Sequence, residues 1–279
     1  MKYSRIIAIV AMVTMAFAAC KDVQQPAQTT TSDAPESEEP TLKPLTYSFV
    51  NSYPHDTTAF TEGLVIQEGK LYESTGSPED MPSTRSIIGV VDKATGEIDV
   101  KVEIDRRKYF GEGIVFLNGK LYQLTYVNKL GFVYDAKTFK KIGEFRYANK
   151  EGWGLTTDGT HLIMSDGTDK ITYLDPETYN VVKTLTVTST YGPVKYLNEL
   201  EYIKGFIFAN AYTTNVLVKI DPNTGRIIGK IDLTRLAEQA HAKYRGSMEM
   251  NGIAYDASDN TVYFTGKMWP YIFQIQIAD

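Results

Sequence analysis

The sequence predicts an all-β fold, a five-bladed β-propeller, and three observations lead to this prediction. A polar–glycine–aliphatic step, or a close variant of it, occurs five times at intervals of 50, 41, 45 and 53 residues. Each step opens an apolar, strand-like run that is followed by a second one, and four copies later reach an Asp-x-x-Thr turn. Repeats of this length with several strands each are typical of propeller blades. The five steps are Glu62-Gly63-Leu64, Glu112-Gly113-Ile114, Trp153-Gly154-Leu155, Asn198-Glu199-Leu200 and Asn251-Gly252-Ile253.

Residues 1–19 have the pattern of a lipoprotein signal peptide. A basic start precedes a mostly apolar run that is shorter than the ~20 residues needed to span a bilayer. The run ends in Phe17-Ala18-Ala19-Cys20, which resembles a bacterial lipobox except that Phe17 replaces the usual aliphatic residue. We therefore expect lipidation of Cys20 and anchoring in the bacterial cell envelope, on its periplasmic or cell-surface face. The alternative is an unmodified cysteine beside an ordinary signal cleavage site.

The next segment, residues 20–43, is expected to be a disordered tether. It is rich in Pro, Thr, Ser, Gln and Glu and has almost no large apolar residue. The propeller is then expected over residues 44–279, which is long enough for one domain with a substantial core. The formal net charge of −5 becomes −7 when the two basic residues of the leader are removed. An acidic domain without a basic run is a poor candidate for nucleic-acid binding.

Within each repeat, short turns such as Asn118-Gly119 separate the first run from a second run rich in aromatic and β-branched residues. Such dipeptides allow the positive φ that tight hairpins need. A third run ends, in four copies, in an aspartate with a threonine three residues later. Because the aspartates recur blade by blade and do not converge on one ion, we interpret them as turn formers, not metal ligands. They are Asp92, Asp135, Asp175 and Asp221.

A fourth run completes four of the repeats but is missing from the last one. The run from Thr46 to Tyr53 has no partner in its own repeat, so we expect it to supply the outer strand of the last blade. Closure of this kind removes open sheet edges and favours a monomer. Residues 234–244 are expected to form a short helix between the fourth and fifth blades.

Residues at equivalent positions of the blades are expected to meet at one end of the central channel. The inner runs are expected to start at the same height along the channel. The second runs are antiparallel to them, so their ends are expected to return to the same end of the channel. The polar residues at these positions are Glu62, Glu112, Asn198, Asn251 and Lys267, and the aromatic ones are Phe60, Phe110, Tyr126, Trp153 and Tyr212. Apolar walls with a few convergent polar groups describe a pocket for a small molecule or a chain end.

Each of these residues also has a structural interpretation. Glu112 could hold two blades together, Asn198 could form a turn, and the aromatic residues could belong to the core. Lys267 could be solvated or could pair with Glu62 or Glu112. We favour a site, because an acid, an amide and an amine occur together at equivalent positions.

No zinc site of the ordinary kind is predicted. Cys20 is the only cysteine, and the three histidines are not at ligand spacing. No Gly-x-Ser-x-Gly elbow or phosphate-binding glycine loop occurs either. A structural calcium in the channel is left open.

Five segments that carry the candidate residues resemble, in order, the motifs of the plant and bacterial glutaminyl-peptide cyclotransferases. They are Phe60-Thr61-Glu62-Gly63-Leu64, Phe110-Gly111-Glu112-Gly113, Glu151-Gly152-Trp153-Gly154-Leu155-Thr156, Leu197-Asn198-Glu199-Leu200-Glu201 and Thr265-Gly266-Lys267-Met268-Trp269-Pro270. The resemblance spans essentially the whole expected domain. That family folds as a five-bladed propeller, in agreement with the number of repeats.

The resemblance implies an acyltransferase that converts the N-terminal glutamine of a peptide or protein to pyroglutamate and releases ammonia. By motif position, Glu112 corresponds to the general acid/base and Asn198 to the amide that orients the substrate carboxamide. Lys267 corresponds to the amine that stabilises the developing oxyanion, and Trp153 to a wall of the pocket.

Three of the candidate substrate-binding residues depart from the family pattern. Tyr126 and Tyr212 stand where relatives often carry tryptophan, and Glu62 stands where many carry glutamine. Tyrosines change the shape of the pocket and add hydroxyl groups. A second carboxylate close to Glu112 is expected to raise the pKa of one of the two acids.

The expected reaction needs a proton shuttle and an oxyanion donor, so no metal or other cofactor is expected. The animal-type enzyme of this activity is a zinc protein of another fold. One alternative is a non-catalytic propeller that binds peptides or envelope components, and a weaker one is a lactonase or other hydrolase with a channel metal. The combination of Glu112, Asn198 and Lys267 favours the cyclotransferase.

Overall fold

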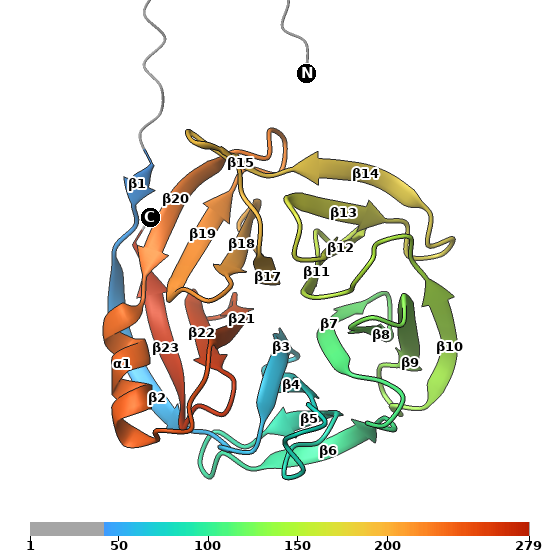
Figure 1. Cartoon of the computed structure of the whole chain (residues 1–279), viewed down its shortest axis with the longest axis horizontal. Helices are drawn as coiled ribbons and strands as arrows, with labels where there is room; N and C mark the ends of the chain where they lie inside the picture. The colour runs from blue at the N-terminus through green and yellow to red at the C-terminus, as the bar shows by residue number, and fades with distance from the viewer. Residues whose placement is uncertain (1–41, 279) are drawn as a thin grey trace, which may run out of the picture. The chain divides into compact units, whose positions relative to one another are not determined.

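The computed structural model describes residues 42–278, which form a five-bladed β-propeller, as predicted (Figure 1). Five sheets surround a central axis, and β3, β7, β11, β17 and β21 are their innermost strands. The expected signal peptide, Cys20 and all but the last two residues of the expected tether lie outside the described residues. In the part that is described, no helix has the length and apolar character needed to cross a membrane.

The first three blades each contain four antiparallel strands in chain order from the inside outward. The first blade consists of β3 (Phe60–Gln67), β4 (Lys70–Gly76), β5 (Ile87–Val91) and β6 (Ile98–Glu103). The second consists of β7 (Gly111–Leu117), β8 (Lys120–Thr125), β9 (Leu130–Asp135) and β10 (Lys141–Arg146). The third consists of β11 (Leu155–Thr157), β12 (Leu162–Ser165), β13 (Lys170–Leu174) and β14 (Val181–Thr186).

The last two blades follow the same plan with additions. The fourth consists of β17 (Leu197–Ile203), β18 (Phe206–Ala211), β19 (Val216–Ile220) and β20 (Ile227–Asp232). The fifth consists of β21 (Met250–Asp256), β22 (Thr261–Gly266), β23 (Tyr271–Ile277) and β2 (Tyr47–Pro54). A small hairpin of β15 (Thr188–Ser189) and β16 (Gly192–Pro193) precedes the fourth blade. Helix α1 (Thr234–Lys243) lies between the last two blades in sequence, as predicted.

The outer edges of the last two blades are covered by the first described strands. β2 pairs antiparallel with β23 over its whole length, so it occupies the place of the fourth strand in the fifth blade. The preceding β1 (Lys43–Pro44) pairs parallel with β20 of the fourth blade, and Leu45 N donates to Lys230 O at 2.8 Å. We expected Lys43 in the tether, but the exposed edge of β20 offers its backbone a hydrogen-bonding partner.

The repeated polar–glycine–aliphatic step proves to be a β-bulge. The pairing register of the inner strand shifts at this step in the first, second, fourth and fifth blades. In the third blade β11 begins at Leu155, the last residue of the step, so Trp153 and Gly154 precede the strand. A bulge inserts one unpaired residue and re-aims side chains. Side chains along a strand point alternately to the two faces of the sheet. The bulge therefore frees the side chain of the first residue of the step from this alternation.

The second residue of the step lies where neighbouring inner strands touch. A Cβ on Gly113 would lie 2.5 Å from Leu155 N, and one on Gly154 would lie 2.3 Å from Asn198 O. Gly113 N also donates directly to Trp153 O at 2.9 Å. Side chains at these positions would force the blades apart.

Glu199 replaces this glycine in the fourth blade and fills the axis. Its fully buried carboxyl accepts hydrogen bonds from Leu64 N at 3.2 Å and Ile253 N at 2.7 Å, so it joins three blades. Burial raises the pKa of this carboxyl well above its usual range, and Glu201 raises it further. Glu201 itself accepts from Tyr255 N at 2.9 Å, and burial raises its pKa to about 7.

The Asp-x-x-Thr segments are turns, as predicted. Asp135 Oδ1 accepts hydrogen bonds from both the backbone nitrogen and the hydroxyl of Thr138, each at 2.8 Å, and Asp175 does the same for Thr178. The residue that follows the threonine has a positive φ in all four copies, namely Gly96, Phe139, Tyr179 and Gly225. Within residues 42–278 no three His, Cys, Asp or Glu side chains gather in a way that could hold a metal ion.

We predict that Gly154→Ala destabilises the propeller by roughly 1–3 kcal/mol, because the added methyl group would overlap the backbone of the next blade. Urea unfolding of the purified protein measures this change as a lower midpoint. Gly143→Ala in β10 is the matched control, because its nearest neighbour would be Val133 Cβ at 3.9 Å. Equal midpoints for the two variants would contradict close packing at the axis.

Candidate functional site

All nine candidate catalytic and substrate-binding residues line one cavity of about 300 Å³. They are Phe60, Glu62, Phe110, Glu112, Tyr126, Trp153, Asn198, Tyr212 and Lys267, and Pro78 is the one further lining residue. A larger hollow of about 680 Å³ among the hairpin turns of the first three blades contains none of them. The expectation that these side chains converge is therefore correct, whatever their individual roles.

Glu62 and Lys267 form a buried ion pair on the floor of the cavity. Lys267 Nζ lies 2.7 Å from Glu62 Oε1, and the two side chains are only 8% and 2% exposed. Asn251 Nδ2 donates to Glu62 Oε2 at 2.8 Å and to Thr61 O at 3.1 Å. We expected Asn251 at the mouth, but these two contacts hold its fully buried side chain behind Glu62, outside the cavity lining.

The Lys267 amine is held in its charged form. Burial lowers its pKa, but the carboxylates of Glu62 and Glu112 outweigh this effect, so the pKa lies above its ordinary value. The ammonium also lies 4.6 Å from the ring centre of Phe60 and 5.5 Å from that of Tyr212, so cation–π contacts add to the ion pair. The cavity thus contains a fixed positive charge.

Glu112 is the second acid of the cavity and differs from Glu62 in its contacts. No donor in the described part of the chain makes a hydrogen bond to its carboxyl oxygens, although its backbone carbonyl accepts one from Ser74 Oγ at 2.7 Å. Burial raises its pKa well above the usual range, Glu62 raises it further, and Lys267 lowers it. A free, buried carboxyl with a raised pKa suits proton transfer near neutral pH.

Burial also raises the pKa of Glu62, to about 7, while Lys267 opposes this shift. The two acids share one cavity and one amine, so they titrate as an interacting pair. Lys267 and Asn251 make hydrogen bonds to Glu62 and not to Glu112. Ionisation of the pair is therefore favoured at Glu62, and the proton is favoured at Glu112.

Asn198 presents an amide that is free to bind a ligand. Its carbonyl oxygen Oδ1 is buried and has no hydrogen-bond partner among the described residues. Its backbone carbonyl is fixed by Ser165 Oγ at 2.6 Å. A buried polar atom without a partner costs about 1–3 kcal/mol. Oδ1 of Asn251 is also without a partner among the described residues, but of these two amides only that of Asn198 belongs to a residue that lines the cavity.

The aromatic walls fit because two glycines leave room for them. Gly76 and Gly167 occupy the ends of the second strands, where other blades carry Tyr126, Tyr212 and Lys267. A Cβ on Gly167 would lie 2.6 Å from the Trp153 ring, and one on Gly76 would overlap the Phe110 ring even more closely. Trp153 with Tyr212 and Phe60 with Phe110 then make edge contacts, with ring centres 5.6 and 6.0 Å apart, and Phe110 packs against the tilted ring of Tyr126 at 5.9 Å.

Two residues at the cavity were not predicted. Pro78 lines the wall from the loop after β4. Glu151 Oε2 accepts a hydrogen bond from Trp153 Nε1 at 3.0 Å and thereby fixes the indole ring. The motif Glu151-Gly152-Trp153 contained the second residue, but only the fold shows that the carboxylate turns back onto the ring.

Comparisons with known proteins agree with this site. The family model described as glutamine cyclotransferase matches residues 15–277, which include every residue of the cavity. A glutaminyl-peptide cyclotransferase of Arabidopsis thaliana is 36% identical over 230 residues, which cover 82% of this chain and 70% of the relative. The crystal structure of Myxococcus xanthus glutaminyl cyclase matches with a TM-score of 0.75 and 28% identity, over 86% of this chain and 100% of the other. The chain therefore belongs to the glutamine cyclotransferase family.

Proposed function

We propose that this protein is a glutaminyl-peptide cyclotransferase that converts the N-terminal glutamine of peptides or proteins to pyroglutamate and releases ammonia. The observation that carries the proposal is the convergence of a free acid, a free amide and a fixed amine in one aromatic cavity: Glu112, Asn198 and Lys267. Membership of the family and the name of the Arabidopsis relative support it. The cavity volume of about 300 Å³ suits one residue at the end of a chain.

In the proposed reaction the α-amine of glutamine attacks the carbonyl carbon of its own side-chain carboxamide. A new C–N bond closes a five-membered ring, and the bond to the amide nitrogen breaks to release ammonia. The protein must fold the side chain back and hold it, since an intramolecular attack needs no second reactant. The walls formed by Phe110, Trp153 and Tyr212 limit the conformations that the bound side chain can adopt.

Glu112 acts as the proton shuttle in this proposal. Its carboxylate takes a proton from the attacking amine and returns it to the departing nitrogen. Burial and the neighbouring Glu62 raise its pKa, which makes its carboxylate a stronger base than an exposed one. The absence of hydrogen bonds to this carboxyl from the described residues leaves it free to contact the substrate.

Lys267 stabilises the oxyanion that forms on the carboxamide oxygen. Glu62, which is itself held by a hydrogen bond from Asn251, pairs with this amine, so the amine is already oriented before the reaction. A preorganised donor of this kind typically lowers the barrier by about 3–4 kcal/mol. Asn198 orients the carboxamide through its free amide group. None of these steps requires a metal, so we propose a metal-independent enzyme.

We further propose that the domain acts as a monomer at the bacterial cell envelope, attached through a lipid on Cys20. The anchor is supported by the leader and the lipobox-like segment of the sequence, and the monomer by the pairing of β2 with β23, which covers the outer edge of the fifth blade.

The first prediction concerns Glu112→Gln, which removes the proton shuttle and keeps the side-chain shape. We expect kcat to fall by about 10²–10⁴-fold in an assay of ammonia release from dipeptides that begin with glutamine. Glu144→Gln, an exposed change in the same blade, is the control and is expected to keep full activity. Undiminished release by folded Glu112→Gln would refute the mechanism, and binding without release by the wild type would identify a non-catalytic propeller.

The second prediction concerns Glu62→Gln. Glu62 raises the pKa of Glu112, so its neutralisation is expected to lower that pKa and move the acidic limb of the kcat/KM profile to lower pH. The ionisation of the substrate amine affects the profiles of the wild type and the variant equally. The difference between the two profiles therefore reflects the ionisation of groups on the enzyme. A limb that stays in place, or moves to higher pH, would show that the two carboxyls do not interact.

The third prediction concerns the anchor. Cys20→Ser removes the only thiol, so we expect the protein to move from the detergent-rich phase to the aqueous phase in a detergent-partition experiment on expressing bacteria. Unchanged partitioning of wild type and variant would exclude lipidation of Cys20.

A further inference from the structure

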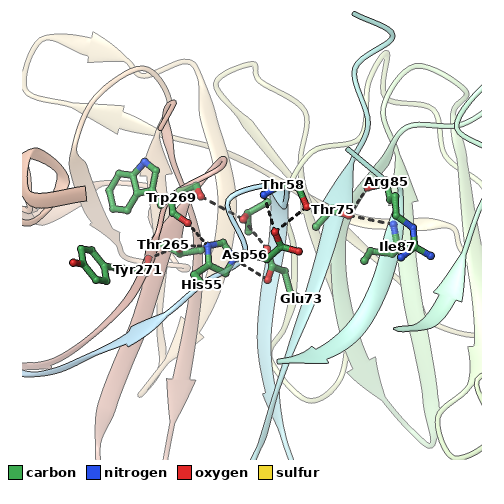
Figure 2. A network of polar contacts seen from close by, with 12 residues as sticks. His55, Asp56, Thr58, Glu73, Thr75, Arg85, Ile87, Thr265, Trp269 and Tyr271 are labelled. Carbon is green, nitrogen blue, oxygen red and sulfur yellow. Dashed lines mark hydrogen bonds and ion pairs between the residues drawn. The ribbon is translucent and has the colours of Figure 1, made fainter. Parts of the chain in front are cut away.

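A buried histidine–glutamate pair lies where the first and fifth blades meet (Figure 2). His55 follows β2, and Glu73 belongs to β4. Nε2 of His55 lies 3.0 Å from Glu73 Oε2 and 3.1 Å from Oε1, and both side chains are fully buried. Neither residue lines the cavity, so the proposed reaction leaves this pair without a role.

Both ring nitrogens of His55 face acceptors. Nδ1 lies 2.7 Å from Trp269 O, a carbonyl oxygen that can only accept. On the other side, the Glu73 carboxylate already accepts a hydrogen bond from Thr61 Oγ1 at 2.7 Å and also takes the one from Nε2. When Glu73 is ionised, the ring satisfies both partners with a proton on each nitrogen, which is the cationic form of His55.

The carbonyl that His55 holds belongs to the turn that carries Lys267. Trp269 lies two residues after Lys267, between β22 and β23. Met268, between them, has a φ of +58°, a conformation that is uncommon for a residue with a side chain. Its backbone nitrogen donates to Ala59 O at 2.7 Å. Among the hydrogen bonds that hold this turn, the one from His55 to Trp269 O has a charged donor. A hydrogen bond with a charged donor is stronger than one between neutral groups.

We propose that His55 and Glu73 are positioning residues for Lys267: the charge-assisted hydrogen bond from His55 to Trp269 O fixes the turn that presents the Lys267 amine to the cavity. The kinetic consequence rests on the proposed function, but the structural one does not. Figure 2 shows the arrangement, with Thr265 and Trp269 of the fifth blade on one side of the His55 ring and Glu73 of the first blade on the other.

Because His55 is titratable, the stability that the His55–Glu73 pair contributes to the fold depends on pH. Burial lowers the pKa of His55, but the carboxylate of Glu73, with a smaller contribution from Asp56, raises it above 6.5 overall. The hydroxyl of Thr265, which packs against Nδ1 at 3.3 Å, carries no charge. A raised pKa in the folded state stabilises the fold below pH 6.5, and this contribution is lost as the pH rises through the folded-state value.

The test is Glu73→Gln, which removes the charge and keeps the side-chain size and an acceptor for Thr61. The readout is the rate at which an amine-reactive acylating reagent modifies Lys267, followed by mass spectrometry of the folded protein. We expect Lys267 to react about tenfold faster than in the wild type, the size expected for losing one hydrogen bond to a charged group. The exposed Lys137 is the internal reference and is expected to keep its rate.

The kinetic arm uses the same variant with glutamine-led dipeptides. We expect kcat to fall by about tenfold with little change in KM, since Lys267 acts on the oxyanion and not on the ground state. Glu73→Asp, which retains the charge, is expected to recover most of the loss. Asp158→Asn, which neutralises the partner of the half-exposed His161, is the matched control and is expected to change neither readout.

Unchanged labelling of Lys267 in folded Glu73→Gln would overturn the proposal. If that variant does not fold, the double variant His55→Asn with Glu73→Gln removes both charges, leaves no unpaired buried ion, and is held to the same criterion. A wild type that releases no ammonia would refute the proposed function alone, because the labelling experiment still reports whether the pair positions Lys267.

Discussion

The structure depends on how closely five inner strands can approach one axis. Their backbones come into contact at the repeated bulges, where Gly113 and Gly154 have no space for a side chain. Hydrogen bonds cross between blades at this level, such as the one from Gly113 N to Trp153 O. Glu199 completes the arrangement, because its carboxyl accepts hydrogen bonds from backbone nitrogens of two other blades. The narrow axis therefore favours glycine, or a residue that bonds across the axis, at the second position of the step.

The same bulges explain why a fivefold pattern produces an asymmetric site. Each bulge releases one side chain from the strand alternation, and the five copies of the step carry two acids, two amides and one indole at this position. Two copies supply acids, and the contacts behind them separate their properties. Lys267 and Asn251 stabilise the charge on Glu62, whereas Glu112 has no such partners in the described chain and keeps its proton more readily. Chemistry at the cavity is thus set by neighbours as much as by the acids themselves.

Most of the fold and the membership of the cavity could be predicted from sequence, because both follow from the repeat. Once the five steps are aligned, equivalent positions must share one level, and Asp135 and its counterparts must form equivalent turns. What could not be predicted depends on pairing across long distances. The bulge is visible only in the register of two strands, and Asn251 was misplaced because its hydrogen bond to Glu62 crosses from the last blade to the first. His55 and Trp269 are likewise 214 residues apart in sequence.

The position of Glu199 at the axis has a consequence for how a substrate enters the cavity and how products leave it. Glu199 follows the cavity residue Asn198 in β17, and its fully buried carboxyl bonds the inner strands of two other blades, so packed groups occupy the axis next to the cavity. In the proposed reaction, ammonia would have to leave through the opening by which the peptide entered. The cyclised chain end stands in that opening, so departure of the small product and of the large one would be linked, and the walls formed by Trp153 and Tyr212 would control both.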